Sequence, residues 1–72
     1  MKYMRFGVVI EMGDRNCSAY VPDLPGCVAT GATVEETKAR IEHGIELHLK
    51  GMREAGETIP EARTVCENVQ VA

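Results

Sequence analysis

The carboxylates in the first half of the chain are the side chains that come nearest to a catalytic arrangement. Glu11 ends a run of alternating apolar and polar residues, and Asp23 stands between two prolines. Two-metal hydrolysis needs several carboxylates that hold their ions about 4 Å apart. Only Glu11 and Asp23 are placed to approach each other, and two acids are too few. We therefore expect no catalytic residue, no metal site and no cofactor.

The three cysteines, at positions 17, 27 and 66, are odd in number and include no CxxC pair. This spacing fits neither a disulfide framework nor a zinc site. We expect three small, buried apolar side chains. Because no apolar run approaches the roughly 20 residues of a membrane span, and no signal peptide is evident, the expected location is the cytoplasm, away from membranes.

The charge of the chain is unevenly distributed. The net charge is −3, and all of it falls on residues 32–72, where eight glutamates face five basic residues. An acidic surface is poorly suited to binding a phosphate backbone. It is better suited to approaching a basic partner. The expected partner is therefore a protein, with no direct binding to nucleic acid.

Residues 22–26, which we call the elbow, combine Pro22, Asp23, Leu24, Pro25 and Gly26. Proline fixes φ and has no amide donor, so a strand cannot continue through this segment. Gly26 can adopt the positive φ that a proline turn requires at its next position. The pattern predicts a rigid turn. Asp23 either caps amides within the elbow or contacts a basic partner.

The periodicity of the chain predicts an α+β fold. Residues 4–12 alternate, with Met4, Phe6, Val8, Ile10 and Met12 on the buried face, and further short strands are expected at 17–21 and 27–31. Together these form an antiparallel three-stranded meander. One long helix packs on one face, and alternation over 65–71 predicts a short C-terminal strand. The order is βββαβ, in a single domain over residues 1–72.

The helix has clear start and stop signals. Thr33 and Glu36 have the spacing of a capping box, in which each side chain bonds the other residue's amide. Gly56 is a plausible C-cap. Gly44 lies beside the apolar stripe, which predicts a close approach of helix to sheet. The apolar stripe of the helix comprises Val34, Ile41, Ile45, Leu49 and Met52.

A single helix leaves the second face of the sheet uncovered. That face would hold Tyr3, Arg5, Gly7 and Val9, together with either Tyr20 or the set Cys17, Ala19 and Val21 from the second strand. A partly apolar sheet face with unpaired edges favours association. We therefore expect a homodimer.

The motifs resemble those of the HicB-like antitoxin family. The similarity rests on residues 19–27, on Thr30-Gly31-Ala32-Thr33 with two following glutamates, and on residues 45–49 and 56–60. The resemblance implies a partial ribonuclease-H-like fold that neutralises a HicA-type toxin, a small basic RNA-cleaving protein. Many family members add a C-terminal DNA-binding segment. This chain stops after one tail strand, so we expect it to lack that segment.

The expected function is therefore that of a non-enzymatic, antitoxin-like binding module. The alternative is a divalent-metal-dependent nuclease or hydrolase on the same ribonuclease-H-like fold, with Glu11 and Asp23 as its acids. The candidate protein-binding residues come from the elbow, the strand before it and the outer face of the helix. They are Tyr20, Pro22, Asp23, Leu24, Pro25 and Leu47.

Overall fold

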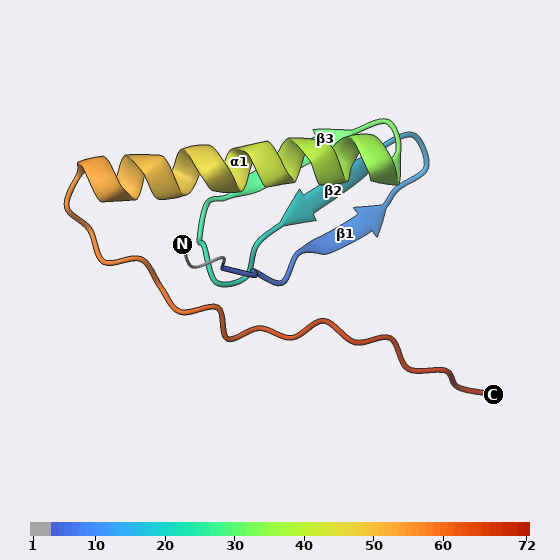
Figure 1. The fold of residues 1–72 in the computed structure, drawn as a ribbon. Coiled ribbons are helices and arrows are strands. Elements are labelled where there is room, and N and C mark those ends of the chain that lie inside the picture. Colours follow the sequence, from blue (N-terminus) through green and yellow to red (C-terminus); the bar gives the residue numbers. More distant parts are fainter. Residues whose placement is uncertain (1–3) are drawn as a thin grey trace.

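Three antiparallel strands and one long helix make up the regular structure of the chain. A computed structural model describes residues 4–72, so Tyr3 lies outside the described residues. The strands are β1 (Val9–Met12), β2 (Cys17–Tyr20) and β3 (Val28–Gly31), and the helix is α1 (Val34–Glu54). The sheet has the order β1-β2-β3, with α1 lying across one face (Figure 1). The predicted α+β meander with a single covering helix is confirmed.

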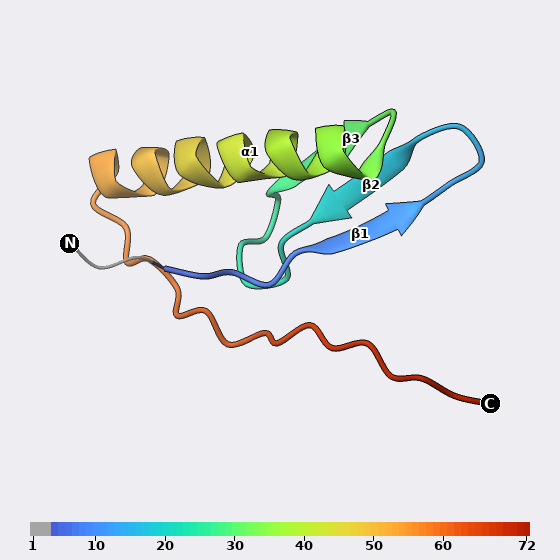
Figure 2. The ribbon, with the colours of Figure 1, turned by 45° about the vertical axis from the view of Figure 1, so that its right-hand side comes forward.

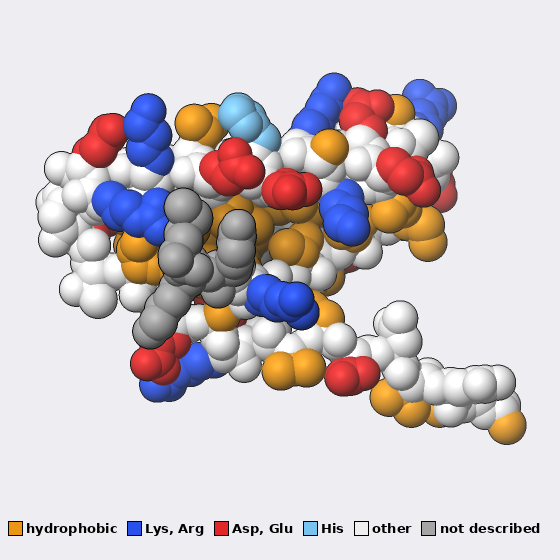
Figure 3. Space-filling model, viewed as in Figure 1, with side chains coloured by type: hydrophobic (Ala, Val, Ile, Leu, Met, Phe, Trp, Pro, Cys, Tyr) orange, Lys and Arg blue, Asp and Glu red, His pale blue; other side chains and the backbone are white. Residues whose placement is uncertain are grey.

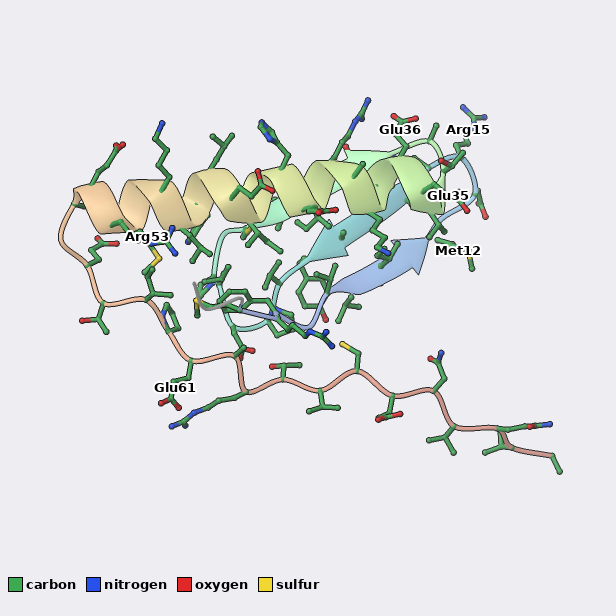
Figure 4. All side chains as sticks on the ribbon, in the orientation of Figure 1. Met12, Arg15, Glu35, Glu36, Arg53 and Glu61 are labelled. Carbon is green, nitrogen blue, oxygen red and sulfur yellow. The ribbon has the colours of Figure 1, made fainter. Side chains whose placement is uncertain are left out.

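The first strand is shorter than the alternation predicts. Regular pairing begins at Val9, opposite Tyr20, and ends with Met12 opposite Cys17. Phe6 and Val8 still pack against the core from the segment before the strand. Met12 was expected to be buried, but 77% of it is exposed. It lies at the hairpin end of an edge strand, where it points away from the core (Figure 4).

The ends of α1 use local hydrogen bonds, as their sequence predicts. The Thr33 hydroxyl accepts the amide of Glu36 at 3.1 Å. The Glu36 carboxylate does not return to Thr33; it forms an exposed ion pair with Arg40 instead, at 2.6 Å. At the other end Gly56 has φ of +73° and its amide donates to the carbonyl of Arg53. The amide of Glu57 reaches back to Met52, which completes a Schellman motif.

The elbow consists of two consecutive proline turns. The amide of Leu24 donates to Val21, and the amide of Cys27 donates to Leu24, both at 3.0 Å. Gly26 has φ of +86°, which confirms the predicted positive angle after Pro25. The amide of Val21 also donates to the carbonyl of Cys27, closing the base of the loop. Three backbone hydrogen bonds and the positive φ of Gly26 therefore hold the elbow in one shape.

The hydrophobic core lies between α1 and the helix-facing side of the sheet. Cys17, Ala19 and Val21 point toward the helix, so Tyr20 belongs to the opposite face of the sheet, which we call the open face. Cys17 and Cys27 are buried as expected, but Cys66 is exposed. The buried apolar cluster comprises Ala19, Val21, Leu24, Cys27, Ile41 and Leu49.

Residues 57–72, which we call the tail, contain no regular strand. The tail leaves the end of α1 and runs below the sheet in both ribbon views (Figures 1 and 2). The strand predicted at 65–71 is not confirmed, because an extended segment becomes a strand only when a neighbour pairs with its backbone. Within residues 4–72, no helix is long and apolar enough to cross a membrane.

Candidate protein-binding surface

Tyr20 and the exposed prolines of the elbow, Pro22 and Pro25, are close neighbours in the chain, and we call them the elbow surface. Pro22 and Pro25 are exposed, and Tyr20 is 43% exposed on the open face immediately before the elbow. Val28 of β3 pairs with Tyr20 across the sheet and is also exposed. The structure therefore brings together an aromatic ring, two rigid prolines and a valine. Rigid aromatic and apolar groups of this kind are typical of protein contacts.

Leu24 is not part of that surface. Its side chain is only 1% exposed and belongs to the core cluster. The expectation that Leu24 contacts a partner is corrected, because the two turns of the elbow direct it inward. A leucine between two prolines has no sequence signal that distinguishes an inward from an outward orientation. Its role is to anchor the elbow to the core.

Asp23 joins the elbow to the tail. Its Oδ2 accepts the backbone amides of Arg63 at 3.0 Å and Thr64 at 2.9 Å. Its Oδ1 accepts the Thr64 hydroxyl at 2.9 Å. The backbone hydrogen bond from Thr64 is the main reason that the pKa of Asp23 lies below its ordinary value. All the hydrogen bonds described for this carboxylate thus come from the tail, and none comes from the elbow amides.

Acidification is expected to release the tail at Asp23. The pKa of Asp23 is lowered in the folded protein. Its contribution to stability is therefore complete above the ordinary aspartate pKa, about 3.9, and disappears as the pH falls through the lowered value. Amide hydrogen exchange should show Arg63 and Thr64 protected at neutral pH and unprotected in acid. Asp23→Ala should remove the protection at every pH.

The control for this experiment is Asp14→Ala, which removes an exposed acid from the β1–β2 turn. This variant should retain the protection of both tail amides. If Asp23→Ala left their exchange unchanged, other contacts would hold the tail. One such contact exists, since the Cys66 thiol donates to the carbonyl of Val8 at 3.6 Å.

Leu47 lies on a different side of the molecule from the elbow. It is 56% exposed on α1, roughly opposite the helix face that buries Ile41 and Leu49. Tyr20 lies beyond the sheet, on the open face. One flat partner could not cover both residues. The structure therefore separates the candidate residues into an elbow surface and a helix position.

The carboxylates do not assemble into a catalytic site. Glu11 pairs with Ser18 toward the hairpin end of β1, whereas Asp23 follows the opposite end of β2. Both oxygens of Asp23 are already occupied by the tail. Within residues 4–72, no three His, Cys, Asp or Glu side chains are placed to hold a metal ion. Nothing in this geometry favours the nuclease alternative.

Comparison with known proteins identifies the family. Residues 6–71 match the family described as the HicB-like antitoxin of bacterial toxin-antitoxin systems. The chain belongs to the HicB-like antitoxin family. The similarity covers the sheet, the elbow, α1 and the tail, so the elbow and the Asp23–Thr64 contact both lie within the matched region.

Two curated relatives are similar to this HicB-like chain. An uncharacterized 14.9 kDa protein from the rep-hol intergenic region of Haemophilus phage HP1 is 31% identical over 86% of the chain and 47% of the phage protein. A UPF0150 protein of Helicobacter pylori is 43% identical over 64% of each sequence. The chain thus spans about half to two thirds of these relatives. No solved structure matched it.

Proposed function

We propose that this HicB-like chain neutralises a small, basic, HicA-type RNA-cleaving toxin by forming a direct complex with it. The module acts in the cytoplasm as a homodimer, has no enzymatic activity of its own, and does not bind nucleic acid directly. Its fold is a partial ribonuclease-H-like fold. The observation that supports this most strongly is the family match over residues 6–71.

The elbow surface supplies the rigid part of the proposed toxin contact. Tyr20, Pro22 and Pro25 are exposed, while Leu24 fixes the loop to the core from inside. A preformed loop loses little conformational entropy on binding, so more of the contact energy appears as affinity. Asp23 contributes by holding the tail beside the elbow. Leu47 is proposed as a second, separate contact on the helix.

The charge distribution supports a basic partner. Residues 32–72 hold the entire net charge of −3. Acidic side chains project from α1 and from the tail in the space-filling view (Figure 3). Complementary charge accelerates association with a basic protein and disfavours contact with RNA. Cys17, Cys27 and Cys66 are all free thiols, which agrees with the proposed reducing compartment.

The proposal is tested with the small basic protein encoded next to this chain. Purified toxin should bind the chain in calorimetry and lose its RNA-cleaving activity in the complex. Tyr20→Ala should weaken binding about tenfold or more, because truncation of a central aromatic contact typically costs at least 1–2 kcal/mol. Leu47→Ala tests the helix contact in the same assay.

Met12→Ala is the matched control, since it removes an exposed apolar side chain at the hairpin end of β1, away from the elbow. It should bind toxin as the unmodified chain does. Thermal unfolding of each variant separates lost binding from lost folding. A neighbour that is neither toxic nor bound would contradict the proposal. So would Mg²⁺-dependent RNA cleavage by this chain that Glu11→Gln abolishes.

A further inference from the structure

The tail is bound to the body of the molecule at one end and exposed at the other. Asp23 accepts the amides of Arg63 and Thr64 and the Thr64 hydroxyl, a group of hydrogen bonds that we call the clasp. Beside the clasp, a Cβ at Gly7 would lie only 2.8 Å from the carbonyl oxygen of Thr64. Farther along the tail, Val69 is 81% exposed. The tail therefore has a fixed starting point next to the segment that leads into β1.

The tail and the first strand segment run in the same direction. Thr64 lies beside Gly7, and the Cys66 thiol donates to the carbonyl of Val8 at 3.6 Å. Positions therefore rise together along the two segments. The ribbon views agree, since the tail passes below β1 and both run toward the same side of the molecule (Figures 1 and 2). Any pairing between them would be parallel.

A hollow separates the tail from β1 beyond these contacts. Its volume is about 420 Å³, and residues 8–10 and 64–68 line it. In the order β1-β2-β3, β1 pairs with β2 on one side only. The other side of β1 presents backbone N–H and C=O groups without a strand neighbour. The tail is thus the segment placed to pair with this edge.

The existing contacts determine which side chains of a paired tail would face the helix. Phe6 and Val8 pack against the core, so Gly7 between them faces the open side of the sheet. Thr64 lies next to Gly7 on that side. Because successive side chains alternate, Val65 comes to the helix side, beside Val8. In this register the helix-facing set of the tail is Val65, Glu67 and Val69, beside Val8, Ile10 and Met12 in that order.

The register pairs two apolar side chains that are both exposed in the present arrangement. Met12 is 77% exposed at the hairpin end of β1, and Val69 is 81% exposed in the tail. Side by side on neighbouring strands, each would cover part of the other. Burial of apolar surface contributes about 25 cal/mol per Å². Closure of the tail therefore covers the end of the edge strand that α1 leaves open.

The register also brings Glu67 to a position where a cation lies near. Glu67 would lie beside Ile10, which lines a hollow under α1 together with Lys38 and Glu42. Glu46 lines only the adjoining hollow, which Ile10 and Lys38 do not reach. Lys38 then supplies the opposite charge for Glu67, which shares it with Glu42.

The clasp favours the chain's own tail over the tail of a second copy. A segment tethered by a short linker has an effective concentration in the millimolar range. Here the pairing residues follow directly after Thr64, which Asp23 already holds. A tail from another molecule enters at the concentration of the protein in solution. At micromolar concentrations the molecule's own tail therefore occupies the β1 edge.

We propose that residues 65–69 close onto β1 of their own molecule as a parallel strand, with the Asp23 clasp as the fixed end. The closed tail extends the sheet beyond β1 and covers Met12. It leaves β3 and the open face as the parts of the sheet that a partner can approach. This inference goes beyond the proposed function and does not depend on toxin binding.

Hydrogen exchange and methyl NMR on the full chain test the closure. A parallel strand bonds one neighbour through every second residue, so alternate amides within residues 65–69 should exchange at least tenfold more slowly than in an unfolded peptide. Protection should be equal at about 20 and 200 µM, because both lie below the effective concentration of a tethered tail. In a mixture of ¹³C-labelled and unlabelled copies, methyl contacts between Val69 and Met12 should occur within single molecules.

Val69→Asp and Gln70→Asp form a matched pair, because they add the same charge at neighbouring positions on opposite sides of the closed strand. Val69→Asp should abolish the protection of residues 65–69, whereas Gln70→Asp should retain it. Equal protection in the two variants would overturn the closure. So would unprotected amides in the unmodified chain, or Val69–Met12 contacts found only between different molecules. None of these measurements involves the toxin, so their outcome is independent of the proposed function.

Discussion

Leu24→Ala is expected to lower the free energy of unfolding by about 2–5 kcal/mol, the range for truncating a buried leucine. Leu24 is 1% exposed and packs in the core cluster with Val21 and Ile41. A domain of this size has a total stability of about 4–11 kcal/mol. The substitution therefore removes a large fraction of it. Urea unfolding followed by circular dichroism measures the change.

Leu47→Ala is the matched control for this experiment. It removes the same side chain from an exposed position on α1 and should change the free energy of unfolding by no more than about 0.5 kcal/mol. The elbow surface should also lose toxin affinity in Leu24→Ala, because its anchor is gone. A Leu24→Ala protein as stable as the Leu47→Ala protein would show that the elbow does not insert into the core.

Gly31→Ala is expected to destabilise the fold by about 1–3 kcal/mol through overpacking. A Cβ at this position would lie 2.6 Å from the Thr37 hydroxyl oxygen and 2.9 Å from the Thr37 amide nitrogen. Thr37 is completely buried, and its hydroxyl donates to the carbonyl of Thr33 at 2.7 Å. The start of α1 would have to move away from β3. The same urea titration measures the loss.

Gly44→Ala is the control, since its Cβ would meet only the Cys27 sulfur, at an ordinary 3.9 Å. The helix was predicted to approach the sheet closely at Gly44. The closest approach of these two glycines is instead at Gly31, where β3 meets the start of α1. Gly44→Ala should stabilise the helix by up to about 1 kcal/mol. Adding Thr37→Ala to Gly31→Ala should recover part of the loss, because the hydroxyl contact is removed and the backbone contact remains. Unchanged stability in Gly31→Ala would mean that the helix start shifts freely.

Features that depend on neighbouring residues were predictable from the sequence. Thr33 as the N-cap, Gly56 after the helix and the positive φ of Gly26 all follow from hydrogen bonds or torsion angles within a few residues. The alternation in β2 separated Tyr20 from Cys17, Ala19 and Val21, but it did not indicate which of these two sets faces the helix. Packing of α1 against Cys17, Ala19 and Val21 decided it.

The second half of the capping box shows where local patterns stop being sufficient. Glu36 has the spacing to reach Thr33, yet its carboxylate pairs with Arg40. Both partners lie within one helical turn of Glu36, and both contacts are weak at an exposed surface. The prediction that Met12 is buried was wrong for another reason. The alternation of apolar residues continues as far as the hairpin, but Met12 lies at an end of the edge strand where its side chain stays exposed.

The sequence by itself determined the family, the order of the three strands and the helix, the helix ends and the rigid turn with a positive φ at Gly26, because each depends on short-range spacing. The tertiary structure alone decided that Leu24 lies inside, that Asp23 holds residues 63 and 64, and that a groove separates α1 from the β1 edge. These contacts join residues up to 41 positions apart. No local periodicity specifies such a meeting, which exists only once the chain has folded.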